Sequence, residues 1–307
     1  MSKYLPDFAG VFCLAIFLIT ISTISEGLFS DGDPFWHIKA GSVMLEQGHL
    51  IDSDIFSHTA SGTPWTAHEW LSEIIMASIN NIAGLEGLLC FFLLIVALSF
   101  WLLYKITEKL SNQWVTFGCV VLALILSPLH MAARPHMFTW LFMLITLAIL
   151  ISGGKRLYWL PAVTMVWANL HGGFILGIVL QIIFITGEAI ENRLVSLREI
   201  LQKQKVPWIV LLLSVFAIGI NPFGYELLLF PFQVSKGVFS VMINEWKAPN
   251  LQDLWYFRFY LVALVMLISF AKSTVTWTER LLIVFFLNAA LTHLRHMSLM
   301  IMALTPF

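Results

Sequence analysis

Long apolar runs, separated by short polar segments, repeat along the whole chain. A membrane-spanning helix needs about 17 to 20 mostly apolar residues. Eight runs come near that length, and two more are shorter or stop with the last residue. The eight lie near residues 8–25, 84–106, 114–131, 137–152, 174–190, 207–220, 256–271 and 279–292, and the other two lie at 157–170 and 297–307. We therefore expect an all-α polytopic membrane protein with about ten transmembrane helices, in one domain over residues 1–307.

Composition supports this class of protein. Of the 307 residues, 59% are hydrophobic and 11% are charged, and the mean hydropathy is +0.86. The net charge of −1 offers no basic surface to a nucleic acid, so we expect none as a partner. Cys13, Cys90 and Cys119 lie in apolar runs without C-x-x-C spacing, which predicts neither a disulfide framework nor a thiolate metal site.

The orientation follows from the basic residues. With the N-terminus in the cytoplasm, 11 of the 17 Lys and Arg residues fall on the inner side, as the positive-inside rule favours. All nine histidines and 12 of the 18 carboxylates then fall on the outer side or at outer helix ends. We expect any chemistry to be extracytoplasmic; the alternative is that longer outer loops collect polar residues by chance.

Two large outer segments are predicted, at 26–83 and 221–255. The first contains two helical patterns, near 34–47 and 67–82. In the second pattern the apolar residues recur on one face, which suits helices that lie flat in the membrane interface. These apolar residues are Trp70, Leu71, Ile74, Ile75, Ile79 and Ile82.

The stretch Asp31-Gly-Asp33-Pro-Phe-Trp-His37 begins the first outer segment. Two carboxylates in D-x-D spacing can share a divalent cation, which in turn neutralises a phosphate. Asp33 also precedes Pro34, and an Asp at the N-cap with Pro at the first helical position is a common helix start. The role of Asp33 as an N-cap therefore stays open.

The segment Thr66-Ala-His68-Glu69 has a similar ambiguity. It matches a capping box, in which the Glu side chain returns to the backbone amide of the N-cap residue. His68 has no such structural explanation. Further along, Arg134-Pro-His136 joins two predicted spans, where an arginine can make bidentate contacts to phosphate oxygens. Snorkelling of Arg134 toward lipid headgroups is the alternative.

Three later outer motifs also carry polar groups. Asn169 and His171 lie in W-A-N-L-H-G-G-F, where glycines allow close approach of a ligand, although a tight turn explains them too. Glu245 and Lys247 lie in N-E-W-K, which also suits an interfacial belt. Arg295 and His296 lie between the last two apolar spans, where charged groups are expensive and usually functional.

As an ordered set, these motifs resemble the GT-C class of membrane glycosyltransferases, and most closely a bacterial branch that is distantly like oligosaccharyltransferase catalytic subunits and protein O-mannosyltransferases. The shared order is D-x-D-x-F/W-W-H, D-x-F-S, W-x-x-H-E-W-L, R-P-H/Q-x-F, W-x-N-x-H-G-G-F, N-P-x-G, E-W and a late R-H/N pair. In this chain these motifs lie at residues 31–37, 54–57, 65–71, 134–138, 167–174, 221–224, 245–246 and 295–296.

The resemblance implies a GT-C-like fold in a bacterial inner membrane and transfer of a sugar, with inversion, from a polyprenyl-phosphate donor to an extracytoplasmic acceptor. It implies a Mg²⁺ or Mn²⁺ ion on Asp31 and Asp33, or one of these carboxylates as a base. The catalytic candidates are Asp31, Asp33, His37, His68 and Glu69. The substrate-binding candidates are Arg134, His136, Asn169, His171, Glu245, Lys247, Arg295 and His296.

Two other functions fit the same pattern. A transporter or flippase of a lipid-linked anion would also place charged groups between broken helices, but it should carry them through the inner half of the spans as well. A noncatalytic subunit of a larger membrane complex would leave the polar groups apart in space. The glycosyltransferase hypothesis instead predicts that Asp31, His37, His68, Arg134, His171 and Arg295 meet in one outward-facing cavity. The sugar, the acceptor and any partner subunit are not defined by the sequence.

Overall fold

The computed structural model describes residues 8–23, 27–29, 32–193, 196–230, 242–270 and 275–307. Within these ranges the chain is all-helical and contains no strand. The α-helices are α1 (Phe8–Thr23), α2 (Asp33–Gln47), α3 (Trp70–Glu108), α4 (Gln113–Leu126), α5 (His136–Ser152), α6 (Leu160–Leu170), α7 (Ile175–Glu191), α8 (Leu197–Lys203), α9 (Lys205–Ile218), α12 (Trp255–Phe270), α13 (Trp277–Thr292) and α14 (Met297–Leu304). Short 3₁₀ turns join them: η2 (Gly27–Phe29), η3 (Pro128–His130), η4 (Gly154–Trp159), η5 (Gly172–Phe174), η6 (Gly224–Leu228), η7 (Asn244–Trp246) and η8 (Leu294–His296).

Every apolar run that the sequence predicts as a span contains a helix. Two helical stretches of the described chain are long and apolar enough to cross a membrane, Trp70–Glu108 and Gly172–Glu191. The other apolar helices are shorter. The all-α class is therefore confirmed, while the count of ten spans stays a prediction.

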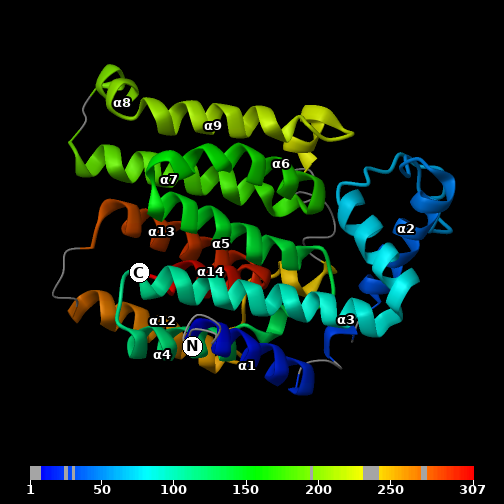
Figure 1. The fold of residues 1–307 in the computed structure, drawn as a ribbon, viewed down its shortest axis with the longest axis horizontal. Helices are drawn as coiled ribbons and strands as arrows, with labels where there is room; N and C mark the ends of the chain where they lie inside the picture. Colours follow the sequence, from blue (N-terminus) through cyan, green and yellow to red (C-terminus); the bar gives the residue numbers. More distant parts are fainter. Residues whose placement is uncertain (1–7, 24–26, 30–31, 194–195, 231–241, 271–274) are drawn as a thin grey trace, which may run out of the picture.

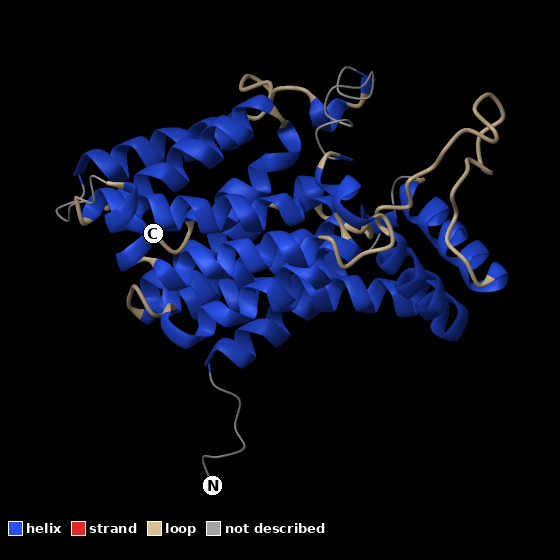
Figure 2. Ribbon diagram, turned by 90° about the horizontal axis from the view of Figure 1, so that it is seen from above, coloured by secondary structure: helices blue, strands red, loops and turns tan. Residues whose placement is uncertain are grey.

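The axes of the long helices are roughly aligned, and the helices form one bundle (Figure 1). Helix α5 packs against α3, α6 and α7, and α13 packs against α7 and α14. Helix α2 packs on α3 and lies at one end of the bundle, to the right in Figure 1. That end also carries the loop between α2 and α3, which projects from the body of the molecule in Figure 2.

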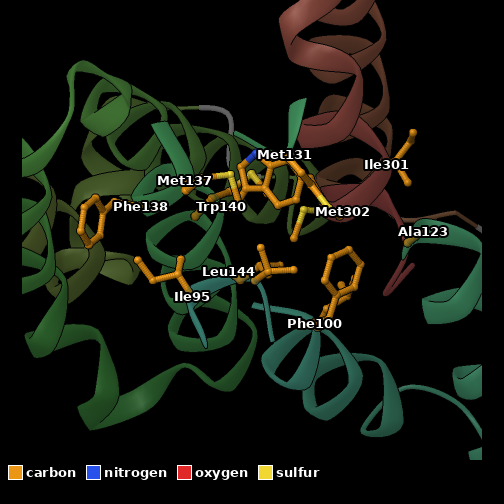
Figure 3. Packing of buried hydrophobic residues seen from close by; sticks show 14 of the residues in the cluster. Ile95, Phe100, Ala123, Met131, Met137, Phe138, Trp140, Leu144, Ile301 and Met302 are labelled. Carbon is orange, nitrogen blue, oxygen red and sulfur yellow. The ribbon is translucent and has the colours of Figure 1, made fainter. Parts of the chain in front are cut away.

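Large apolar side chains fill the centre of the bundle (Figure 3). Trp140 of α5 is buried close to three methionines, Met131, Met137 and Met302, which come from three different segments. Methionine adapts to irregular gaps around a large ring, so it suits this position. The core ends where α5 begins, and polar residues replace apolar ones at that end of the bundle.

The second pattern, at 67–82, corresponds to the first part of α3, which starts at Trp70. Gly84 has non-helical φ and ψ and separates this part, by a kink, from the part that runs to Glu108. That the first part lies in the membrane interface stays a prediction. Gly84 has φ 65°, a conformation that residues other than glycine rarely adopt. The first pattern, at 34–47, is α2, as the sequence predicts.

A glycine also brings α2 and α3 together. A Cβ on Gly41 would collide with the backbone carbonyl of Glu73 and would lie 2.8 Å from the Cβ of Ala77. The two helices can approach this closely only because the position has no side chain. This contact places the first turns of α3 against α2, and both helices then contribute to the site described next.

Candidate functional site

One cavity, of about 540 Å³, collects polar side chains from helix ends that are far apart in the sequence. They come from the start of α2, the segment before α3, the start of α5, the end of α6, η7 and η8. The polar and charged residues that line it are Asp33, His37, His68, Glu69, His130, Arg134, His136, Thr139, His171, Glu245, His293, Arg295 and His296.

Two arginines form one side of this cavity, which we call the cationic wall (Arg134, Arg295). Nη1 of Arg134 lies 3.1 Å from Oδ2 of Asp33, which is an ion pair. Glu245 stands between the arginines: its two carboxylate oxygens each lie 3.8 Å from one guanidinium Nη1. The guanidinium of Arg295 also lies 4.5 Å from the ring centre of Trp246, a cation–π distance.

A buried carboxylate surrounded by imidazoles also lines the cavity; together with Glu73, which lies behind the lining residues, we call this group the acidic wall (His37, His68, Glu69, Glu73, His171). Oε1 of Glu69 lies 3.3 Å from Nε2 of His171 and 3.7 Å from Nε2 of His68. Its other oxygen, Oε2, lies 3.8 Å from Nδ1 of His37. Burial raises the pKa of Glu69 to about 7, so its charge is easily changed near neutral pH.

Two of the surrounding imidazoles are neutral at that pH. Burial lowers the pKa of His68 to about 4, and it also lowers the pKa of His171 well below its ordinary value. The ring of His68 packs on Phe230, with 4.2 Å between ring centres. Neutral imidazoles can donate from one nitrogen and accept at the other, so hydrogen bonds decide which role each nitrogen has.

A chain of hydrogen bonds settles that role for His171. Its Nδ1 accepts the backbone N–H of Gly173 at 2.9 Å. The Thr139 hydroxyl lies 2.7 Å from the same nitrogen and itself accepts Nε1–H of Trp167 at 3.1 Å. Because Nδ1 accepts, the proton of the neutral ring lies on Nε2, which lies 3.3 Å from Oε1 of Glu69. A Cβ on Gly173 would collide with the Thr139 hydroxyl, so glycine is required there.

Glu73 is the most important residue that sequence reasoning missed. It lies one turn after Glu69, is buried, and places Oε1 3.1 Å from Nδ1 of His37. Its other oxygen has no hydrogen-bond partner among the described residues. The sequence contained one indication that Glu73 belongs to the site, because it lies four residues after Glu69 and so on the same helix face. Its neighbours Ser72 and Met76 on the helix are buried.

Both capping hypotheses are wrong. Helix α2 has Gly32 at its N-cap position, and Asp33 lies in the first turn, where it pairs with Arg134 instead of capping. Helix α3 begins at Trp70 with Glu69 at its N-cap position and no side-chain cap, so the predicted box from Thr66 does not form. Both carboxylates face distant partners across the cavity.

The structure brings His37, His68, Arg134, His171 and Arg295 into one cavity, as the sequence predicts; Asp31 lies outside the described residues. The remaining predicted site residues Asp33, Glu69, His136, Glu245 and His296 line the same cavity. Their catalytic and binding roles stay predictions.

Two predicted substrate contacts lie elsewhere. The Asn169 side chain is fully engaged inside the protein: Oδ1 accepts Trp70 Nε1–H at 3.0 Å, and Nδ2 donates to two backbone carbonyls. Asn169 therefore ties α6 to α3 and does not line the cavity. Nζ of Lys247 is exposed and donates to Asn244 at 2.9 Å, so it also points away.

The cation that the resemblance implies on Asp31 and Asp33 can be tested only at Asp33. Oδ2 of this carboxylate lies against a guanidinium, and a metal ion at that oxygen would be repelled by the positive charge of Arg134. Asp33 therefore does not fit a cation site at this position. Within the described residues, the group that could hold a metal is His37, Glu69 and Glu73.

No protein-family model matches this chain, and no curated protein matches it.

Proposed function

We propose that this protein is a membrane glycosyltransferase of the GT-C kind, which moves a sugar from a polyprenyl-phosphate donor to an extracytoplasmic acceptor with inversion. The observation that carries the proposal is one cavity lined by residues of both the cationic wall and the acidic wall. Such an arrangement suits a reaction in which negative charge develops on a leaving phosphate while a hydroxyl loses its proton.

The cationic wall suits the donor phosphate. Two guanidiniums that converge on one carboxylate can converge on a phosphate, because both anions accept paired N–H bonds. Glu245 lies 3.8 Å from each arginine, longer than a hydrogen bond, and so holds this position loosely. A phosphate entering between Arg134 and Arg295 would replace the Glu245 carboxylate there.

An apolar side of the same cavity suits the lipid. Helix α7 contributes Ile175, Leu176 and Val179, and α13 contributes Phe285 and Phe286. A ligand with a charged head and a long hydrocarbon tail satisfies both kinds of surface at once. The cavity volume, about 540 Å³, falls within the range of roughly 300–1,000 Å³ for small-molecule sites, enough for a sugar phosphate.

The chemistry is a single displacement at the anomeric carbon. The acceptor oxygen forms a bond to that carbon on the face opposite the phosphate, and the bond from carbon to the phosphate oxygen breaks. The phosphate keeps the electron pair, and Arg134 and Arg295 stabilise its added charge. The proton of the attacking hydroxyl leaves toward the acidic wall.

The membrane topology belongs to the same proposal. We place the chain as a multi-pass protein of a bacterial inner membrane with its N-terminus in the cytoplasm and the cavity at the outer face. The two long apolar helices and the positive-inside count support this placement.

The proposal is tested by donor binding and turnover. Purified protein in lipid nanodiscs is mixed with polyprenyl phosphate, with a panel of polyprenyl-phosphate sugars and with a cell-envelope extract that supplies the acceptor. Binding of the lipid phosphate and transfer of the sugar are both followed by mass spectrometry. We expect the lipid phosphate to bind and one donor to lose its sugar. Arg134→Gln should weaken binding roughly tenfold or more, because it removes a charged hydrogen-bonding group.

The exposed Arg156, in η4, gives the matched control Arg156→Gln. Equal binding by both variants, or no cleavage of any donor, would contradict the proposal. Movement of intact lipid phosphate across the bilayer without cleavage would instead support a transporter. The sugar and the acceptor are then identified from the glycans and lipid-linked sugars that change in a deletion strain.

A further inference from the structure

Three buried side chains of the acidic wall place metal-binding atoms close together. One nitrogen or oxygen from each of His37, Glu69 and Glu73 lies within 4.8 Å of the other two. Nδ1 of His37 is 3.1 Å from the nearer Glu73 oxygen and 3.8 Å from Oε2 of Glu69. Helix α2 supplies the imidazole, and the segment that begins α3 supplies both carboxylates.

A second observation concerns one carboxylate oxygen of Glu73. Oε2 of Glu73 is buried and has no hydrogen-bond partner among the described residues, and the side chain is only 2% exposed. A buried carboxylate oxygen without a donor is costly, and two adjacent carboxylates add their mutual repulsion. A bound cation removes both costs.

We propose that His37, Glu69 and Glu73 bind one divalent transition-metal ion, of the zinc or manganese type, at the acidic wall. Bonds of about 2.0–2.2 Å to imidazole nitrogen and carboxylate oxygen separate neighbouring ligand atoms by roughly 3 to 4 Å. The two distances from His37 fall in that range. An imidazole in the ligand set favours these ions over Mg²⁺ and Ca²⁺, which prefer oxygen.

The hydrogen-bond chain behind Glu69 fits this role. Metal-binding carboxylates and imidazoles are usually held by an outer set of hydrogen bonds. Nε2 of His171 lies 3.3 Å from Oε1 of Glu69, and Thr139 fixes the His171 ring. Oε1 therefore lies next to His171, while Oε2 lies 3.8 Å from Nδ1 of His37 and is the oxygen placed for the ion.

The ion would be open to the cavity. His37 and Glu69 line the cavity, whereas Glu73 lies behind them. Three protein ligands leave at least one coordination position for an oxygen from the cavity side, as in catalytic metal sites. This part of the inference rests on the proposed function, in which that oxygen belongs to the acceptor or to the donor phosphate.

The test measures metal binding without donor or acceptor. Protein with a non-histidine affinity tag is stripped with chelator and reloaded with Mn²⁺ or Zn²⁺, and the bound metal is measured by elemental analysis and, for Mn²⁺, by electron paramagnetic resonance. We expect one ion per chain and a higher unfolding temperature in its presence, because a ligand of the native state stabilises it. Mg²⁺ should compete weakly.

Glu73→Gln keeps the size of the side chain and removes a ligand. We expect it to lose affinity by more than the roughly 10–100-fold that an outer-shell change costs. Glu86→Gln, at an exposed position on α3, is the matched control and should bind as wild type does. Size-exclusion chromatography and circular dichroism verify that each variant is folded.

The inference is overturned if wild-type protein neither retains the ion nor gains stability from it, or if Glu73→Gln and Glu86→Gln bind alike. Loss of the ion in Asp33→Asn but not in Glu73→Gln would move the site to the D-x-D motif. Metal binding without sugar transfer contradicts only the proposed function, and sugar transfer by a protein that binds no metal ion contradicts only this site.

Discussion

The hydroxyl oxygen of Thr139 lies 2.7 Å from Nδ1 of His171, and together with the backbone N–H of Gly173 this contact leaves the proton of the neutral ring on Nε2. The Trp167 indole donates to the same hydroxyl, so the hydroxyl's own hydrogen is directed to His171. The ring proton therefore lies on Nε2, the nitrogen next to Glu69. This arrangement depends on Thr139 of α5, Trp167 of α6 and Gly173 of η5.

Replacing Thr139 by valine should therefore free His171 to exchange its proton between nitrogens. The ¹⁵N chemical shifts of the ring report this directly, and we expect them to move toward a mixture of tautomers. The variant also leaves the Trp167 N–H without its acceptor, at a cost of about 1–3 kcal/mol of unfolding free energy.

Thr139→Ser keeps the hydroxyl and should restore the wild-type spectrum. Thr146→Val, at another buried threonine of α5, gives a control outside the cavity. Unchanged ¹⁵N shifts in Thr139→Val would show that the Gly173 amide alone fixes the tautomer.

Gly41→Ala should destabilise the fold and disturb the acidic wall together. The added Cβ collides with the Glu73 carbonyl, and overpacking of this kind costs about 1–3 kcal/mol. Gly118→Ala is the control: no atom lies within 4 Å of the place that its added methyl group would take, so the change should add up to ~1 kcal/mol of helix stability. Thermal unfolding in detergent measures both, and equal unfolding temperatures would argue against a tight contact between α2 and α3.

Glu245→Gln should strengthen the binding of phosphate ligands. The substitution removes a negative charge that lies 3.8 Å from both arginines of the cationic wall, while the side chain keeps its size. Titration calorimetry with a polyprenyl phosphate measures the change. Glu226→Gln, an exposed position in η6, is the control. Weaker binding by Glu245→Gln would mean that this carboxylate positions the arginines and does not occupy the anion site.

The loop between α2 and α3 should loosen in acid because of Asp54. Hydrogen bonds from the Ser57 hydroxyl and from the amides of Ser57 and Phe56 lower the pKa of Asp54 below its ordinary 3.8. A carboxyl with a lowered folded pKa stabilises the loop above the ordinary value, and this stabilisation is lost as pH falls through the folded pKa.

Hydrogen exchange at Phe56 and Ser57 should therefore be slow at neutral pH and lose its protection below pH 3.8. Asp54→Asn should show less protection at both pH values, whereas Asp52→Asn should behave as wild type, because Asp52 takes part through its backbone carbonyl. Protection in Asp54→Asn equal to that of wild type would show that the backbone bonds alone hold the loop.

A cysteine at Ser61, in the same loop, should react with membrane-impermeant reagents applied to the outer, periplasmic face of the inner membrane. The background requires removal of Cys13, Cys90 and Cys119, all of which are free thiols. Labelling only from the cytoplasmic side would reverse the proposed topology.

The apolar runs predicted the helices well, because each run is a continuous segment that forms one helix by its own local hydrogen bonds. The run at 137–152, for example, corresponds to α5 at His136–Ser152. The pattern at 67–82 and the span that starts at 84 meet at Gly84, as the sequence predicts, because the non-helical φ and ψ of this glycine separate the two helical parts of α3.

The sequence predicted those site residues whose polar side chains stand beside apolar helices, where they cost free energy. It did not predict the contacts between residues that are far apart in the chain. His171 and Arg295 stand beside apolar helices, which marked them as functional candidates. Asp33 and Glu69 matched local capping patterns, but Arg134 and His171 compete for them from 101 and 102 positions further along, which no local pattern reveals. Glu73 looked like an ordinary polar residue of an amphipathic helix until Gly41 brought α2 onto it.

The two bonds that tie α3 to the end of α6 have a consequence for biosynthesis. Trp70 meets Asn169, and Ser72 meets the carbonyl of Leu170, across 99 and 98 residues of chain. During translation the acidic wall stays unassembled until the ribosome has passed His171, and the cationic wall waits longer, for Arg295. A nascent chain that ends between these two points therefore lacks part of the residues that line the cavity.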